Sequence, residues 1–160
     1  MIHHVSFAAQ DPERVARAIA VLWRGKAFPF VTPGSWIAMA GDERGTQMEI
    51  YPAGTELRPG DPKAPFGEFS HAANASRHSA SHAAIASPLS DEEIHGLAAR
   101  EGWISRYNKR GGIFGVIEFW VENSFLLEVL TPAMQAEYTG FMSKIDNWRE
   151  LLAKGPPRAA

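Results

Sequence analysis

The sequence contains no cysteine, which excludes a disulfide framework, thiolate metal ligands and a cysteine nucleophile. It also has no apolar run near the roughly 20 residues that a membrane-spanning helix needs. The first residues, MIHHVSFAA, lack the basic start of a signal peptide. A cysteine-free chain suits a reducing compartment, so these absences predict a cytoplasmic protein.

An excess of charge of either sign is also missing. The formal net charge of the 160 residues is −2 and the pI is near 6.3, so no overall field would recruit nucleic acid or an anionic membrane. The basic cluster of Arg106, Lys109 and Arg110 falls where a turn is expected and is interpreted as a solvated face. A small-molecule partner is therefore favoured.

The composition is that of a globular protein, with 45% hydrophobic, 11% aromatic and 21% charged residues. A chain of this length buries roughly two-thirds of its unfolded surface and needs no covalent staples. We therefore expect one domain over residues 1–160.

Residues 1–52 follow the order strand, helix and three strands. Alternating residues over 2–9 predict the first strand, and Asp11 as N-cap predicts the start of an amphipathic helix over 12–23. Three β-rich runs follow, at 26–31, 35–40 and 46–51.

Residues 53–80 are rich in glycine, proline, alanine and serine, which predicts a long linker, lid or binding arm. A short helix near Phe66–Asn74 is the alternative. His71 and His78 lie in this segment and would approach a site only if the linker folded over it.

Residues 81–132 repeat the order of the first module. A strand over 81–87 precedes a helix that begins with the capping box of Ser90 and Glu93. Three β-rich runs follow, at 103–108, 113–121 and 124–130, and an apolar stripe then predicts one C-terminal helix over 132–154. The predicted fold class is α+β, with two βαβββ modules plus that helix.

Histidine and glutamate recur at equivalent places in the two modules. His4 lies in the first strand of module one and Glu49 lies 45 positions later in its last strand; His82 and Glu128 are 46 positions apart in module two. A glutamate among aliphatic strand residues is costly unless it is paired or binds a cation. Two imidazoles and two carboxylates suit Ni, Zn, Co, Mn or Fe, so these residues predict one shared divalent cation.

Simpler interpretations exist for each of these residues. A histidine at a strand start can be satisfied locally, and a glutamate in an edge strand can face water. A shift of one residue would exchange His4 for His3, because strand side chains alternate. Glu118 also has apolar neighbours but no matching histidine, so we expect it on the outer face of its sheet.

The matched positions resemble the vicinal oxygen chelate superfamily, which includes glyoxalase I, bleomycin-resistance proteins and extradiol dioxygenases. That family pairs two βαβββ modules around a cupped sheet, and its metal-dependent members take ligands from the first and last strands of each module. The likeness covers residues 1–132. The order of the four residues is similar to bacterial-type glyoxalase I, which implies that the metal ligands are His4, Glu49, His82 and Glu128.

The sequence departs from the family pattern in three ways. It has Val121-Glu122-Asn123-Ser124 where the family often has an Asp-Pro-Asp-Gly-like turn, its linker is longer, and the C-terminal helix is an addition. No counterpart of the glutathione-holding residues of glyoxalase I is recognisable. These departures leave the substrate open.

Three functions follow as hypotheses. The first is a metal-dependent lyase or isomerase, in homodimeric form, that acts on a small oxygenated metabolite through an enediolate-like intermediate; Glu128 by preference, or Glu49, would move the proton. The second is a metal-free drug-binding protein of the bleomycin-resistance type. The third is a non-catalytic dimer whose C-terminal stripe is the interface. A two-histidine, one-carboxylate dioxygenase is less consistent with the four-residue pattern.

Aromatic residues in the predicted strands either line an apolar cup or belong to the ordinary core. They are Phe30, Trp36, Tyr51, Trp120 and Phe125. His95 is interpreted as a solvated helical residue.

Overall fold

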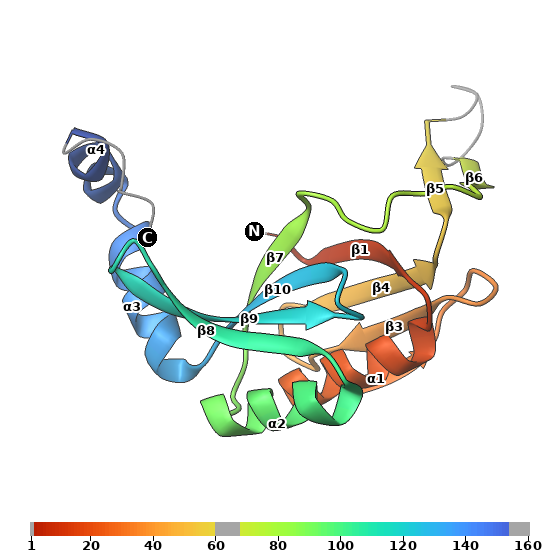
Figure 1. The fold of residues 1–160 in the computed structure, drawn as a ribbon, viewed down its shortest axis with the longest axis horizontal. Helices are drawn as coiled ribbons and strands as arrows, with labels where there is room; N and C mark the ends of the chain where they lie inside the picture. Colours follow the sequence, from red (N-terminus) through yellow and green to blue (C-terminus); the bar gives the residue numbers. More distant parts are fainter. Residues whose placement is uncertain (1, 60–67, 154–160) are drawn as a thin grey trace. The chain divides into compact units, whose positions relative to one another are not determined.

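The structure is a computed structural model that describes residues 2–59 and 68–153 (Figure 1). The chain divides into two compact units, residues 1–80 and 81–160. Each unit contains one strand-helix-strand-strand-strand module, so each can be described by itself.

The first unit contains a four-stranded sheet with the order β1-β4-β3-β2. Strands β1 and β4 are parallel, and the other neighbours are antiparallel. The helix α1 packs on one face through buried Val15, Ile19 and Leu22. The bounds of these elements are β1 His4–Ala9, α1 Pro12–Trp23, β2 Lys26–Pro29, β3 Trp36–Met39 and β4 Gln47–Pro52.

Local chemistry explains where the helix α1 begins and why the chain can turn after it. The side chain of Asp11 accepts a hydrogen bond from the backbone amide of Arg14, which satisfies one of the unpaired amides at the helix start. After the helix, a Cβ at Gly25 would lie 2.0 Å from the backbone oxygen of Met39. Only glycine therefore fits at position 25, where the chain passes close to the backbone of β3.

The segment between the two modules differs from the predicted linker over 53–80. It contains the antiparallel strands β5 (Thr55–Arg58) and β6 (Glu68–His71), which form a two-stranded sheet. Within the suggested helix near Phe66–Asn74, residues 68–71 form a strand, and Phe66 and Gly67 lie outside the described residues. The cross-strand pair of Leu57 and Phe69 explains the difference, because apolar pairs stabilise a ladder that composition alone does not reveal.

The second unit repeats the topology of the first. Its four-stranded sheet has the order β7-β10-β9-β8, with β7 and β10 parallel. The predicted capping box is present, because Ser90 and Glu93 bond reciprocally at the start of α2. The bounds are β7 His82–Ala86, α2 Asp91–Glu101, β8 Ile104–Arg110, β9 Phe114–Val121 and β10 Phe125–Leu130.

The predicted C-terminal helix over 132–154 is instead two helices, α3 (Pro132–Met142) and α4 (Ile145–Ala153). The side-chain amide of Asn147 donates to the backbone oxygen of Phe141 at 3.0 Å and so satisfies a carbonyl at the end of α3. The carboxylate of Glu137 in α3 accepts bonds from Lys109 and from the backbone amide of Gly115, which fastens α3 to the β8–β9 hairpin.

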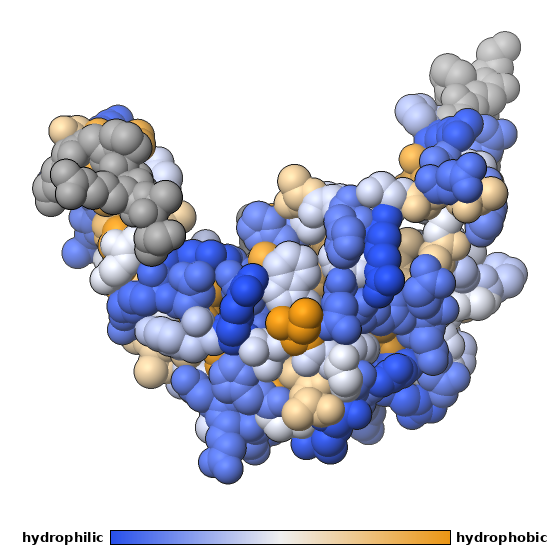
Figure 2. Space-filling view, in the orientation of Figure 1, coloured by the Kyte–Doolittle hydropathy of each residue, from blue (hydrophilic) through white to orange (hydrophobic). Residues whose placement is uncertain are grey.

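The helix α4 has no buried residue, whereas α3 buries Met134. Hydrophobic colouring is visible on the surface around α4 in Figure 2. None of the helices in residues 2–59 and 68–153 has the length and apolar character that a bilayer span requires. The predicted α+β class with two βαβββ modules is confirmed.

Candidate functional site

In the first unit, His4 and Glu49 lie on the same face of the sheet. The parallel register pairs His4 with Gln47 and Ser6 with Glu49, and residues two apart on a strand share a face. The helix α1 covers the other face, where the guanidinium of Arg17 lies over the ring of Trp36. His4 is exposed, so the predicted pair stands on the face that α1 leaves open.

The carboxylate of Glu49 is held through one oxygen. Its Oε2 accepts hydrogen bonds from Ser6 Oγ at 2.9 Å and from Tyr51 Oη at 3.0 Å. Among the residues that the structure describes, Oε1 has no hydrogen-bond partner. Burial and the bond to Glu49 raise the pKa of Tyr51 to about 12, so the phenol remains a proton donor to Glu49 at neutral pH.

Aromatic rings lie beside Glu49. The ring of Tyr51 contacts Phe30 edge to face at 6.3 Å between centroids and contacts Phe69 of β6 at 5.4 Å. These contacts bring the β5–β6 arm next to the strand that carries Glu49. Of the aromatic residues proposed for a pocket, Phe30 and Tyr51 are adjacent to the candidate site, whereas Trp36 packs with α1.

The second unit has the same arrangement. The register of β7 and β10 pairs His82 with Leu126 and Ala84 with Glu128. As between β1 and β4, the glutamate stands opposite the residue that lies two positions after the histidine. His82 and Glu128 therefore share a face of this sheet, and the buried Leu127 and Val129 point to the other.

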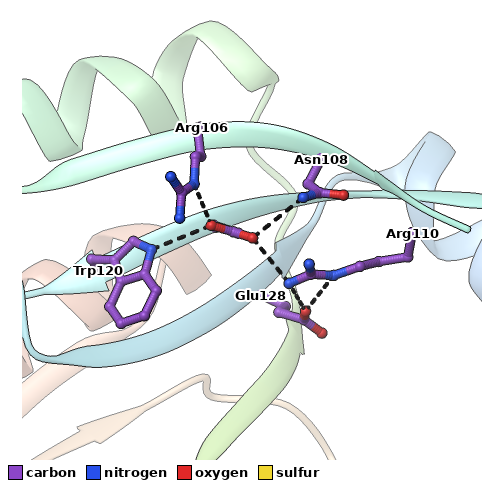
Figure 3. Close-up of polar contacts among 6 residues, drawn as sticks. Arg106, Asn108, Arg110, Trp120 and Glu128 are labelled. Atoms are coloured by element: carbon purple, nitrogen blue, oxygen red, sulfur yellow. Dashed lines mark hydrogen bonds and ion pairs between the residues drawn. The ribbon is translucent and has the colours of Figure 1, made fainter. Parts of the chain in front are cut away.

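One oxygen of Glu128 is also held by a neighbour, here Arg110 (Figure 3). Nε of Arg110 donates to Oε1 at 2.8 Å, and Nη2 pairs with the same oxygen. Oε2 has no partner within residues 2–59 and 68–153. Both candidate ligands thus have one anchored oxygen and one oxygen available for another partner.

Glu118 lies beside the candidate site, and sequence reasoning placed it wrongly. It was expected on the outer face, but it pairs directly with Glu128 and lies on the same face. The side chain of Glu118 is only 6% exposed, and both of its oxygens are engaged. The hydrogen-bond donors, shown in Figure 3, are Arg106 Nε at 2.5 Å, Trp120 Nε1 at 3.4 Å and Asn108 Nδ2 at 3.5 Å, and Arg110 Nη2 forms an ion pair at 3.1 Å.

The charge of Glu118 is stabilised in spite of its burial. Burial raises the pKa of this carboxyl, but the bonds from Arg106 and Trp120 and the charges of Arg106 and Arg110 together lower it below 4.5. The turn at Gly111-Gly112 contains the signal that would have located it. Six residues counted backward and six counted forward from Gly112 pair Arg106 with Glu118.

The basic cluster was also interpreted differently from what the structure shows. Arg106 and Arg110 belong to strand β8 and lie beside glutamates, not in a solvated turn. Lys109 pairs with Glu137 at 2.7 Å. The strand extends to Arg110 because each of these residues finds a cross-strand partner in β9.

The remaining histidines, His3, His71, His78 and His95, lie outside the proposed ligand set. Nδ1 of His3 lies 2.8 Å from the backbone oxygen of Arg44, at the β3–β4 turn. His95 is half-buried and bonds to Ser105 at 2.8 Å, so it is not the solvated residue expected. His71, in β6, packs against Gly54, and His78 is exposed.

No group of three or more histidine, aspartate or glutamate side chains gathers around one point within the described part of the chain. The first unit places His4 and Glu49 on the face that α1 leaves open, and the second unit places His82, Glu128 and the arginine-paired Glu118 on one face of its sheet. A four-ligand site therefore stays a prediction from the sequence pattern.

The fold is similar to that of solved structures. The fosfomycin resistance protein FosX from Mesorhizobium loti superposes with a TM-score of 0.51 at 14% identity, over 87% of this chain and 97% of that one. A possible glyoxalase from Bacillus cereus gives a TM-score of 0.47 at 12% identity, over 81% and 96%. At these identities the likeness shows the fold alone, and the similarity to glyoxalase I in particular stays a prediction.

Neither the comparison with protein-family models nor that with curated proteins gives a match to the sequence.

The ion pairs of Glu118 predict how stability depends on pH. Because the folded pKa lies below the ordinary value of 4.5, the stabilisation is complete above that value and is lost as the pH falls through the folded pKa. We expect Glu118→Gln to lower the free energy of unfolding by about 2 kcal/mol at neutral pH, with a smaller difference in acid. Urea unfolding at pH 7 and pH 3.5 measures this.

The control is Glu43→Gln, at an exposed turn position, which should change stability by less than about 0.5 kcal/mol. A loss in Glu118→Gln that is equal at both pH values would contradict the assigned ion pairs.

Proposed function

We propose that the chain is a metal-dependent lyase or isomerase of the glyoxalase-like type that acts on a small oxygenated metabolite through an enediolate-like intermediate. The observation that carries the proposal is the repeated register. In both units, a histidine of the first strand and a glutamate of the last strand share the open face with the same offset.

The residues present fit a divalent cation. His4, Glu49, His82 and Glu128 would hold it, and their donors suit Ni, Zn, Co, Mn or Fe. Metal-bound carboxylates are commonly oriented by hydrogen bonds to one oxygen. Ser6 and Tyr51 bond one oxygen of Glu49 and Arg110 one oxygen of Glu128, so each has its other oxygen available.

This site needs ligands from both units, so the proposal includes one functional domain over residues 1–160. When bound, the cation would act as a Lewis acid toward two adjacent oxygens of the substrate. Glu128 would loosen from the cation and take a proton from the neighbouring carbon through the freed Oε2, while Arg110 keeps the carboxylate oriented through Oε1. Glu49, anchored in the same manner, is the second candidate for this proton transfer.

The ligand set predicts which histidines metal binding requires. We expect the wild-type protein to take up about one divalent ion per chain, and His4→Ala or His82→Ala to weaken binding by about 100-fold. Competition with a chromophoric chelator, together with elemental analysis, measures both quantities.

The matched controls are His3→Ala and His95→Ala, since these rings bond Arg44 and Ser105. They should leave the affinity within about threefold of wild type, because neither ring belongs to the proposed ligand set. A wild-type protein that takes up no Ni, Zn or Mn, or an equal loss in control and ligand variants, would end the metal hypothesis.

The role of Glu128 predicts a separation between binding and turnover. Glu128→Gln keeps the size of the side chain and leaves His4, Glu49 and His82 as ligands, so metal affinity should fall by about tenfold, less than in His4→Ala. Proton transfer should fall by about 100-fold or more. The readout is metal-dependent deuterium uptake from solvent into a panel of small α-hydroxycarbonyl compounds, followed by proton NMR. Equal exchange rates in Glu128→Gln and wild type would remove Glu128 from this role.

A metal-free drug-binding protein of the bleomycin-resistance type is the second candidate. The contacts of Tyr51 with Phe30 and Phe69 favour it, because they place aromatic surface next to Glu49, and Phe69 is 46% exposed. Elemental analysis separates the two candidates, since only the first requires a cation.

The protein is also proposed to be a homodimer that uses the C-terminal helices. Ile145, Trp148 and Leu152 in α4 are 75%, 49% and 61% exposed. Two of these residues, Ile145 and Trp148, line a groove of about 250 Å³ together with Phe141, Met142 and Lys144. A helix with no buried residue gains stability when a second chain covers its apolar side.

Light scattering after size exclusion should give twice the chain mass of 17.6 kDa. Trp148→Glu should give the single-chain mass, because a charge in the covered surface would be desolvated without a partner. Arg149→Glu, at the neighbouring exposed position, is the control and should remain dimeric. A wild-type protein with the mass of one chain at 100 µM excludes this interface.

A further inference from the structure

We propose that Arg106 and Arg110 form a binding site for a small oxyanion, a carboxylate or phosphonate group, that lies beside Glu128. The inference deepens the proposed function, because this group would belong to the substrate on which Glu128 acts. It rests on the geometry of three neighbouring strands in the second unit.

Charged residues form a line across these strands. The register places Arg106 of β8 opposite Glu118 of β9, and Glu118 opposite Glu128 of β10. Arg110 reaches the line from the end of β8 and contacts both glutamates. Figure 3 shows both guanidinium groups directed toward this line of side chains.

Glu118 orients the two arginines and leaves donors unused. Arg106 donates from Nε to Glu118, and its two terminal nitrogens have no partner within the described ranges. Its side chain is 63% exposed, so a ligand can reach these nitrogens. Arg110 uses Nε and Nη2, and Nη1 has no partner there. A guanidinium held on one edge presents its other edge in a fixed direction, which is the geometry that binds two oxygens of one anion.

The charge of the site points to the same ligand class. Arg106 and Arg110 balance Glu118 and Glu128, so this network is neutral by itself. A divalent cation held by Glu128 would give the network an excess of positive charge. An anionic group on the substrate would reduce that excess, and burial of paired charges costs less than burial of an excess.

The test titrates two probes, acetate and methylphosphonate, at constant ionic strength. Binding is followed by the arginine Nε–Hε signals in NMR spectra of the unloaded and the zinc-loaded protein. We expect saturable shifts of the Arg106 and Arg110 signals and at least tenfold weaker binding in Arg106→Gln. Saturation by both probes indicates a carboxylate site, and saturation by methylphosphonate alone indicates a phosphonate or phosphate site.

The matched control is Arg149→Gln, which removes the same charge from an exposed position in α4. It should bind as wild type does. An affinity that is equal in Arg106→Gln and wild type, or an equal loss in Arg149→Gln, overturns the proposal. If Arg106→Gln does not fold, Arg106→Lys keeps the charge without the two-pronged edge and should still bind at least threefold more weakly, and wild-type affinity in that variant overturns it.

The experiment separates this inference from the proposed function. Metal uptake is measured on the same samples and should be unchanged in Arg106→Gln. Lost anion binding with retained metal uptake supports the arginine site. If wild type takes up no metal, the proposed function fails, and the titration of the unloaded protein still decides whether the arginines bind an anion.

Discussion

Parallel pairing between the first and last strands of each module is the constraint on which the candidate site depends. It places Ser6 opposite Glu49 and Ala84 opposite Glu128. The histidine of each unit lies two residues before Ser6 or Ala84, so it shares a face with the glutamate. Because side chains alternate along a strand, a slip of one residue would turn these polar groups into the helix-covered core. The aliphatic residues between them, such as Ile50 and Val129, are fully buried and prevent that slip.

A second constraint is the burial of Glu118. The residue is 5% exposed, so its carboxylate must be paired; three side chains donate hydrogen bonds to it and Arg110 forms an ion pair. This need aligns Arg106 and Arg110, and Arg110 in turn holds one oxygen of Glu128. The network therefore links a structural requirement of the β8–β9 hairpin to the orientation of a candidate ligand. Ser6 and Tyr51 hold Glu49 through neutral donors, so the two modules achieve the same one-sided anchoring with different chemistry.

Most of the secondary structure could be predicted because each element has a strong local signal. Asp11 and Ser90 mark helix starts, and alternating apolar residues mark the strands of both sheets. The β5–β6 arm was missed because its stability comes from cross-strand and ring contacts of Phe69, which have no local signature. At the break between α3 and α4, the side chain of Asn147 and the backbone amide of Lys144 both donate to the oxygen of Phe141, and a continuous apolar stripe conceals the break in the sequence.

The sequence by itself determined the duplicated topology and the pairing of one histidine with one glutamate in each module, since these follow from spacing and from the two-residue period of strands. Only the tertiary structure decided which oxygens of Glu49 and Glu128 are held, and that Glu118 faces the candidate site with two arginines. Those features depend on which residues of neighbouring strands stand opposite one another. Register across a hairpin or a crossover is a property of the assembled sheet, and alternation along one strand leaves it open.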